Sequence, residues 1–272
     1  MKYPYLYSTM IGFVTLSPLQ SPSCLAATSN DDGAILVLGD SWASLSNLFL
    51  SNVCHLGTDT NGEERAITNN GKSGSTAKQW ASGDLAVQSF TDAKYDYDHV
   101  WLSIGGNDFN CDPSYHEEIA GYILEVISDI FASSSNDNME VLYTGYGYPS
   151  EDICKSGDSA TTIALLDHLA SLIRTKIEKS SYSEKVKVMD IASMFVTEDS
   201  SPFSDKEWYA DDIHINEAGY EKLFSTRAAQ EFFGCIIPQE GDSRSGVTTP
   251  YSLTTYECVI LFAVSFFNVL LF

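Results

Sequence analysis

Four short segments of this sequence carry the residue types that hydrolysis by a nucleophilic hydroxyl requires. That chemistry needs a hydroxyl, a base to take its proton, a carboxylate to orient the base, and hydrogen-bond donors for the developing oxyanion. Ser41, His214 and Asp211 can supply the first three groups. The N–H groups of Ser41 and Gly74 and the side-chain amide of Asn107 can supply the donors. We therefore predict a serine nucleophile at position 41.

Ser41 follows the most clearly apolar segment of the sequence, residues 34–38. This run of apolar residues, rich in branched side chains, predicts a strand buried on both faces of a parallel sheet. Apolar residues then recur at helical spacing, so Ser41 heads a helix, whose free N–H groups favour negative charge. The triplet Gly-Asp-Ser occurs at 39–41, 157–159 and 241–243, and only the first copy follows a buried strand.

His214 is the predicted base, because it has a carboxylate three residues before it in a polar segment ahead of the last helix. We interpret the other histidines as structural or solvated: His55, His99, His116 and His168. The three-residue spacing favours Asp211 over Asp212 as the orienting carboxylate. A serine–histidine dyad in which neither aspartate is essential is the alternative. For Asn107, the alternative is a left-handed turn after two glycines.

The rest of the sequence alternates strand and helix patterns. Further strands are predicted at residues 65–69, 99–104, 139–144 and 185–191. Helices are predicted over 76–90, from a cap at Ser114 past Ile130, over 160–179, and from Asn216 or Glu217 onward. This alternation predicts a single three-layer α/β/α domain with a five-stranded parallel sheet. The segments with Ser41, Gly74 and Asn107 then lie at carboxyl ends of strands, where such sheets bind ligands.

The four segments resemble those of the SGNH (GDSL) hydrolases in their order and rough spacing. The matching residues are Gly39-Asp40-Ser41, Gly74, Gly105-Gly106-Asn107-Asp108 and Asp211-x-x-His214. The resemblance spans residues 34–233 and implies a flavodoxin-like fold that hydrolyses carboxylic esters without a cofactor. It also implies Ser41 as nucleophile, His214 as base and Asp211 as its partner. Ser41 N–H, Gly74 and Asn107 would form the oxyanion hole.

Two features leave finer assignments open. Gly71 is close enough to Gly74 to be the family's glycine instead. Trp42 stands where a Leu commonly follows the serine, so the resemblance does not assign the subfamily or the substrate. Among loop aromatic residues, Trp42, Trp208 and Tyr209 are predicted to line a substrate pocket.

Both ends of the sequence have the composition of processing signals. Residues 1–27 carry a lysine, an apolar middle and a small-residue exit, which predicts a secretory signal peptide. Residues 28–237 are the predicted hydrolase domain. Residues 238–257 are a polar spacer and 258–272 an uncharged apolar tail, which predicts a GPI-attachment signal or a short membrane anchor. We therefore expect a secreted protein, either free or attached to the cell surface.

Removal of both ends leaves Cys54, Cys111, Cys154 and Cys235, an even number that predicts two disulfides. Of the three connectivities, we favour Cys111–Cys154 with Cys54–Cys235, because Cys111 and Cys154 both follow strand ends on the expected active face. No cysteine or histidine spacing indicates a metal site, so no metal or cofactor is expected. The net charge of −22 argues against binding nucleic acid or anionic membranes through charge.

The expected activity is that of a serine esterase acting on a small acyl ester or on an acylated carbohydrate or lipid. The alternatives are an acyltransferase of the same fold acting on sugar hydroxyls and a non-catalytic surface binding module. The short segment between the last strand and Asp211 leaves little room for a large lid. This favours short acyl chains or exposed polysaccharide esters. Nothing in the sequence indicates an oligomeric state.

Overall fold

The structure is a computed structural model that describes residues 34–46, 50, 66–91, 95–197 and 203–233. The predicted signal peptide, polar spacer, apolar tail and Cys54–Cys235 disulfide all lie outside these residues. Within the described part of the chain, no helix is long and apolar enough to cross a membrane.

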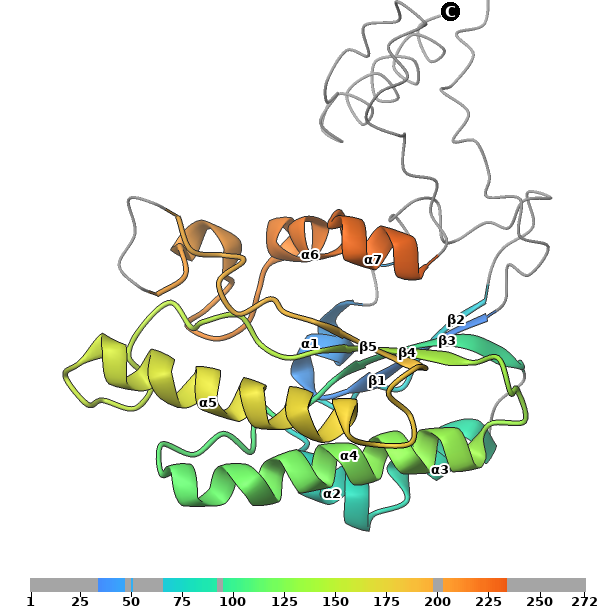
Figure 1. The fold of residues 1–272 in the computed structure, drawn as a ribbon. Helices are drawn as coiled ribbons and strands as arrows, with labels where there is room; N and C mark the ends of the chain where they lie inside the picture. The colour runs from blue at the N-terminus through green and yellow to red at the C-terminus, as the bar shows by residue number, and fades with distance from the viewer. Residues whose placement is uncertain (1–33, 47–49, 51–65, 92–94, 198–202, 234–272) are drawn as a thin grey trace, which may run out of the picture. The chain divides into compact units, whose positions relative to one another are not determined.

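A five-stranded parallel sheet forms the middle layer, in the order β2-β1-β3-β4-β5 (Figure 1). Its strands are β1 (Ala34–Gly39), β2 (Ile67–Asn69), β3 (Tyr97–Ser103), β4 (Glu140–Thr144) and β5 (Val186–Met189). Each lies within or overlaps a strand predicted from the sequence, so the parallel α/β class is confirmed. The strand order reverses between β1 and β3, and the crevice at such a reversal is where open parallel sheets bind ligands.

Helices cover both faces of the sheet (Figure 1). One face carries α1 (Ser41–Leu45), α6 (Glu217–Phe224) and α7 (Arg227–Phe232). The other face carries α2 (Ala77–Ser82), α3 (Leu85–Thr91), α4 (His116–Ser133) and α5 (Ser159–Glu178). Two short 3-10 turns, η3 (Pro113–Tyr115) and η4 (Lys206–Trp208), lie in connecting segments. The result is the three-layer arrangement predicted from the sequence.

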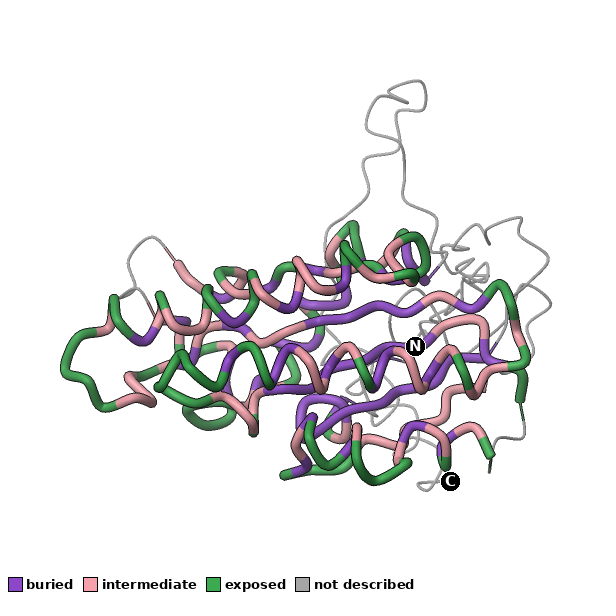
Figure 2. The backbone as a smooth tube through the Cα atoms, turned by 60° about the horizontal axis from the view of Figure 1, so that its bottom comes forward, coloured by how far each residue is buried: buried purple, intermediate pink, exposed green. Residues whose placement is uncertain are grey.

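The apolar run of β1 is buried on both faces, as its composition predicts. Ile35 and Val37 pack toward α6 and α7, whereas Leu36 and Leu38 pack toward α2 and α4. None of these four side chains is more than 1% exposed. Figure 2 shows the same pattern over the sheet, with buried backbone in the strands and exposed positions on the outer faces of the helices. The strand therefore holds the start of α1 in a fixed place.

The predicted helix over residues 76–90 is two helices, because the chain turns at Gly83 and Asp84. Gly83 ends α2, and Asp84 adopts a left-handed φ of 52°, a conformation that Asp tolerates better than most residues. The predicted cap at Ser114 is also wrong. Asp112 instead accepts a hydrogen bond from the Ser114 N–H and caps η3, after which α4 begins at His116.

Other helix starts follow the sequence pattern. Thr76 caps α2 in a reciprocal capping box with Gln79, Asp158 caps α5, and Asn216 caps α6. The last predicted helix continues, after a break at Ser225, as the separate helix α7.

A disulfide joins Cys111 and Cys154, with the two Cα atoms 5.7 Å apart. Cys111 lies in the segment between β3 and α4, and Cys154 lies between β4 and α5. The bond therefore ties together two loops that leave the carboxyl edge of the sheet.

The junction after β1 requires a glycine. A Cβ atom on Gly39 would lie 1.8 Å from the carbonyl oxygen of Ser103, and the φ of +134° is strained for any other residue. We expect Gly39→Ala to lower the free energy of unfolding by more than about 3 kcal/mol, measured by urea denaturation.

Gly145, which follows β4 at the same edge of the sheet, is the matched control. A Cβ there meets no atom within 4 Å, so Gly145→Ala should change the free energy of unfolding by less than about 1 kcal/mol. Equal effects of the two substitutions would contradict the importance of the β1–β3 junction.

Candidate active site

Ser41 is the first residue of α1 and stands directly above the end of β1. Asp40 precedes it and caps the helix, with its Oδ1 accepting a hydrogen bond from the Trp42 N–H at 3.1 Å. The Ser41 side chain is therefore held at a helix N-terminus, where unpaired N–H groups stabilise negative charge. The residue is buried, with 8% of its surface exposed.

His214 reaches Ser41 from the segment between η4 and α6. Its Nε2 lies 2.9 Å from Ser41 Oγ, and its Nδ1 lies 2.7 Å from Asp211 Oδ2. Since the carboxylate can only accept, we assign the ring proton to Nδ1, which leaves the Nε2 lone pair facing the hydroxyl. The structure thus brings the predicted serine, histidine and aspartate into one hydrogen-bonded chain.

Two further hydrogen bonds join α1 to the segment that carries His214 and to α6, which follows it. The indole Nε1 of Trp42 donates to the Ile213 carbonyl at 3.0 Å. From α6, the Tyr220 hydroxyl donates to the Trp42 carbonyl at 2.7 Å. The position of the imidazole therefore depends on the residue directly after the serine.

Asp211 is fixed by its own segment. Its Oδ1 accepts hydrogen bonds from the N–H groups of Ile213, at 2.9 Å, and His214, at 2.7 Å. Partial burial acts to raise the pKa of Asp211, but these bonds and the one from the imidazole together lower it below its usual value. The neighbouring Asp212 is exposed and accepts a hydrogen bond from the Ser150 hydroxyl at 3.3 Å instead.

The candidate oxyanion donors come from the segments after β2 and β3. Asn107 donates one Nδ2 hydrogen to the Ser75 carbonyl at 2.9 Å, which orients the amide, whose second hydrogen is a further donor. Gly74, with φ +77°, donates its N–H to no other described residue. Gly71 donates its N–H to Asn69 Oδ1 at 2.9 Å, and a Cβ there would clash with the backbone of α1. This geometry favours Gly74 over Gly71.

Two carboxyl groups, the buried Asp40 and the half-buried Asp108, brace these segments. Asp108 accepts hydrogen bonds from the N–H groups of Ala77, at 2.6 Å, and Lys78, at 3.2 Å, and so joins the β3 loop to the start of α2. Burial raises the pKa of Asp108 despite these bonds. Asp40 accepts a short hydrogen bond from the Tyr146 hydroxyl through its Oδ2. Both carboxyl groups therefore accept N–H groups at the start of a helix and brace the loops beside Ser41.

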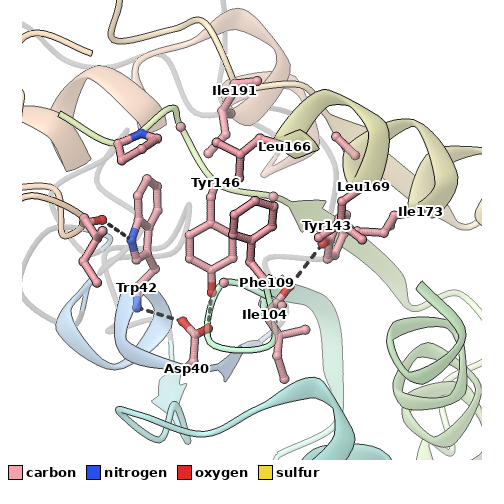
Figure 3. A pocket seen from close by; sticks show the side chains of 18 of the residues that line it. Asp40, Trp42, Ile104, Phe109, Tyr143, Tyr146, Leu166, Leu169, Ile173 and Ile191 are labelled. Atoms are coloured by element: carbon pink, nitrogen blue, oxygen red, sulfur yellow. Dashed lines mark hydrogen bonds between the residues drawn. The ribbon is translucent and has the colours of Figure 1, made fainter. Parts of the chain in front are cut away.

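A largely apolar pocket opens beside Ser41 and His214 (Figure 3). Trp42 lines it, as predicted, with its ring edge-on to that of Tyr146 at 5.1 Å between centroids. Trp208 and Tyr209 are not among the lining residues. Tyr209 is buried against Phe195, because its hydroxyl is drawn to the Tyr148 carbonyl at 2.7 Å.

Sequence reasoning missed the wall of this pocket that α5 supplies. The sequence predicts this helix over residues 160–179, but its apolar spacing does not show which of the apolar residues border a pocket. Leu166 and Leu169 of α5 line the pocket together with Phe109 from the β3 loop. The signal that could have shown it is length: the predicted helix is much longer than the strands it packs on, so part of it must extend past the sheet edge and can line a pocket there.

The other three histidines that the structure describes, His99, His116 and His168, do not line the pocket beside Ser41. His116 is fully buried, with its Nδ1 3.0 Å from His168 Nδ1 and its Nε2 2.7 Å from the Asn110 carbonyl. His99 packs against Phe232. In the described part of the chain, no group of three or more His, Cys, Asp or Glu residues is arranged to hold a metal ion.

Comparison with known proteins gives the following matches. The family model described as GDSL-like Lipase/Acylhydrolase matches residues 25–226. No curated protein matches the sequence significantly. Among solved structures, the chain is similar to a Streptococcus pneumonia protein provisionally assigned as a platelet activating factor. The TM-score is 0.53 and the identity 17%, over 76% of this chain and 86% of that one.

Two further solved structures are similar at lower TM-scores. One is an extracellular lipase from Streptomyces rimosus, with a TM-score of 0.47 and 18% identity over 70% of this chain and 95% of that one. The other is a carbohydrate esterase family 3 protein from Talaromyces cellulolyticus, with a TM-score of 0.47 and 18% identity over 73% and 94%. At 17% identity, the similarity to the Streptococcus protein shows that the two chains share a fold and nothing further.

The buried carboxyl under the site makes stability depend on pH. Burial raises the pKa of Asp40 from 3.8 to about 6, although hydrogen bonds from Tyr146 and Trp42 oppose the shift. Between these values the folded protein keeps a proton that the unfolded chain has lost. The free energy of unfolding should therefore fall as the pH rises from about 4 through about 6.

Asp40→Asn removes this titration. Relative to the variant, the wild type should lose about 2 kcal/mol of unfolding free energy between pH 4 and pH 7, measured by urea denaturation of both proteins. Because the comparison is made at two pH values, any constant cost of the substitution cancels. Parallel pH profiles for the two proteins would show that Asp40 does not titrate in this range.

Proposed function

Since the chain belongs to the GDSL-like lipase/acylhydrolase family and is a hydrolase, we propose that it cleaves carboxylic esters through an acyl-enzyme on Ser41. The observation that carries this proposal is the continuous hydrogen-bonded chain from Ser41 Oγ through His214 to Asp211, at 2.9 Å and 2.7 Å. These distances are those at which a base can accept a proton directly from a hydroxyl.

In the proposed reaction, Ser41 Oγ bonds to the ester carbonyl carbon while its proton passes to His214 Nε2. The carbonyl oxygen becomes an oxyanion, which accepts hydrogen bonds from the N–H groups of Ser41 and Gly74 and from the Asn107 amide. When this intermediate collapses, the bond to the alcohol oxygen breaks and His214 returns its proton to the leaving alcohol. The acyl group stays on Ser41.

Water completes the cycle in the same geometry. His214 takes a proton from the water, whose oxygen bonds to the acyl carbon, and the Ser41–acyl bond then breaks. Ser41 recovers its proton and the carboxylic acid leaves. Asp211, whose pKa is lowered, stays ionised and stabilises the imidazolium formed in both halves of the cycle.

The proposal also places the enzyme in an oxidising compartment, as the predicted signal peptide requires. The Cys111–Cys154 disulfide supports this, because such bonds persist in exported proteins and are rare in reducing cytosol.

Replacement of the nucleophile tests the proposal. Ser41→Ala should lower the rate of p-nitrophenyl acetate hydrolysis at least about 1,000-fold and abolish labelling by a fluorophosphonate probe, because no acyl-enzyme can form. Ser44→Ala, in the same helix and with no side-chain hydrogen bond to a described residue, is the matched control and should keep wild-type activity. Equal hydrolysis rates for wild type and Ser41→Ala, at equal melting temperature, would overturn the assignment.

Substitution of each of two neighbouring aspartates distinguishes a serine–histidine–aspartate triad from a serine–histidine dyad. Asp211→Asn should lower kcat by on the order of 10²- to 10⁴-fold, because the amide no longer holds the imidazole in the reactive tautomer. Asp212→Asn should leave kcat within about twofold, because Asp212 is exposed and makes no contact with the imidazole. If both variants retain wild-type kcat, the serine–histidine dyad is the correct description.

A further inference from the structure

The pocket beside Ser41 continues as an apolar groove along the carboxyl edge of the sheet. It crosses the ends of β1, β3, β4 and β5 and is closed on its outer side by α5. Figure 3 shows its course, with Asp40 and Trp42 at one end, Tyr146 and Phe109 in the middle, and Leu169 and Ile173 at the other. Because Ser41 and His214 line the same groove, any ligand that fills it is continuous with the reacting atoms.

The walls of the groove between its two ends present mostly hydrocarbon. Two tyrosine hydroxyls among them are already paired, since that of Tyr143 donates to the Ile104 carbonyl at 3.1 Å and that of Tyr146 donates to Asp40. A sugar in this position would lose its hydrogen bonds to water and gain few in return. A hydrocarbon chain would lose nothing, and each methylene group buried there should favour binding roughly fourfold.

The far end of the groove is polar. Arg174 of α5 and Asp190, which follows β5, both line it and form an ion pair at 2.8 Å. Their side chains are 43% and 60% exposed, so the pair lies where the groove meets solvent. An apolar chain that passed this point would re-enter water and gain nothing from further length.

The strand spacing gives the length of chain that fits. From Ser41 above β1 to Asp190 beside β5 is three strand spacings, or about 14 Å at roughly 4.8 Å each. An extended alkyl chain advances on the order of 1.3 Å per carbon, given single bonds of about 1.5 Å, so about ten carbons span this distance.

We propose that this groove binds the acyl chain of the substrate, that the Arg174–Asp190 pair limits its length, and that the preferred acyl groups have about eight to ten carbons. The proposal rests on the esterase function proposed above and names its substrate class. It also revises the expectation of short acyl chains drawn from the lack of a lid. A chain can be buried between α5 and the sheet edge without any covering segment.

One small residue on α5 keeps the groove open. Leu166, Ala170 and Arg174 are four residues apart, so they form one row along the helix, and all three line the groove. Ala170 is exposed, so a larger side chain there can be accommodated without disturbing the core. Ala170→Phe should fill the groove midway. Ala164, exposed on the same helix but outside the groove, is the matched control.

The test compares kcat/KM for p-nitrophenyl esters from acetate to palmitate, each below its micelle concentration. In the wild type, kcat/KM should rise at least 100-fold from acetate to the octanoate and decanoate esters and rise no further beyond them. Ala170→Phe should lower the decanoate-to-acetate ratio of kcat/KM at least tenfold, whereas Ala164→Phe should leave the ratio as in the wild type. A wild type that prefers acetate, or a ratio unchanged by Ala170→Phe, would overturn the groove assignment.

Failure of the proposed function gives a different result. In that case the folded wild type would hydrolyse no ester of the series and would not react with the fluorophosphonate probe. The groove is then judged by calorimetry with decanoate itself. Binding to the wild type that Ala170→Phe weakens at least tenfold supports the groove as an acyl site, and absence of decanoate binding rejects it.

Discussion

The hydrogen bond from the Asp40 N–H to the Ser103 carbonyl, at 3.0 Å, joins the chain leaving β1 to the end of β3. The close approach of Gly39 to Ser103 makes this contact possible. Two segments of the candidate active site begin there. On one side the chain turns into α1 and presents Ser41. On the other it continues into the loop that presents Asn107. Because both segments leave a buried sheet edge, their separation is set by the spacing of two strands and varies little.

Carboxyl groups around Ser41 differ in environment, and this separates their roles. Asp40 is buried and Asp108 half-buried below the site, and each accepts hydrogen bonds from backbone N–H groups at the start of a helix. Burial raises the pKa of both, so they are suited to holding segments together and poorly suited to stabilising an imidazolium. Asp211 is more exposed, and its hydrogen bonds lower its pKa. Only this carboxylate combines a negative charge with contact to His214.

Local sequence patterns were sufficient to predict much of this architecture. The buried run at 34–38 and the four later apolar runs predict the strands, because parallel strands in a three-layer fold have few polar positions. The association of Ser41 with His214 also follows, since both lie in segments that leave the same sheet edge. Local signals misplaced the helix break at Gly83 and the cap before α4. There a single residue with an unusual backbone conformation, or a proline turn, decides the geometry.

The groove was beyond sequence reasoning for a different reason. Leu166 and Ile173 have the spacing of core residues, and Ile173 does pack in the core. Whether the apolar face of α5 packs against the sheet or lines a pocket depends on how far the helix extends past the strands. No local sequence pattern encodes that distance. The same holds for Tyr209, whose loop position predicts pocket lining but whose hydroxyl is used inside the fold.

The indole of Trp42 holds Ile213 across 171 positions of the sequence, and Ser41 meets His214 across 173. Closing so long a loop costs conformational entropy, and neither contact can form until both of its segments exist. During synthesis the nascent chain therefore exposes its serine long before the ribosome has made the base. The chain cannot form the Ser41–His214 pair until nearly the whole domain has been synthesised. The order of the segments thus acts as a built-in delay between translation and activity.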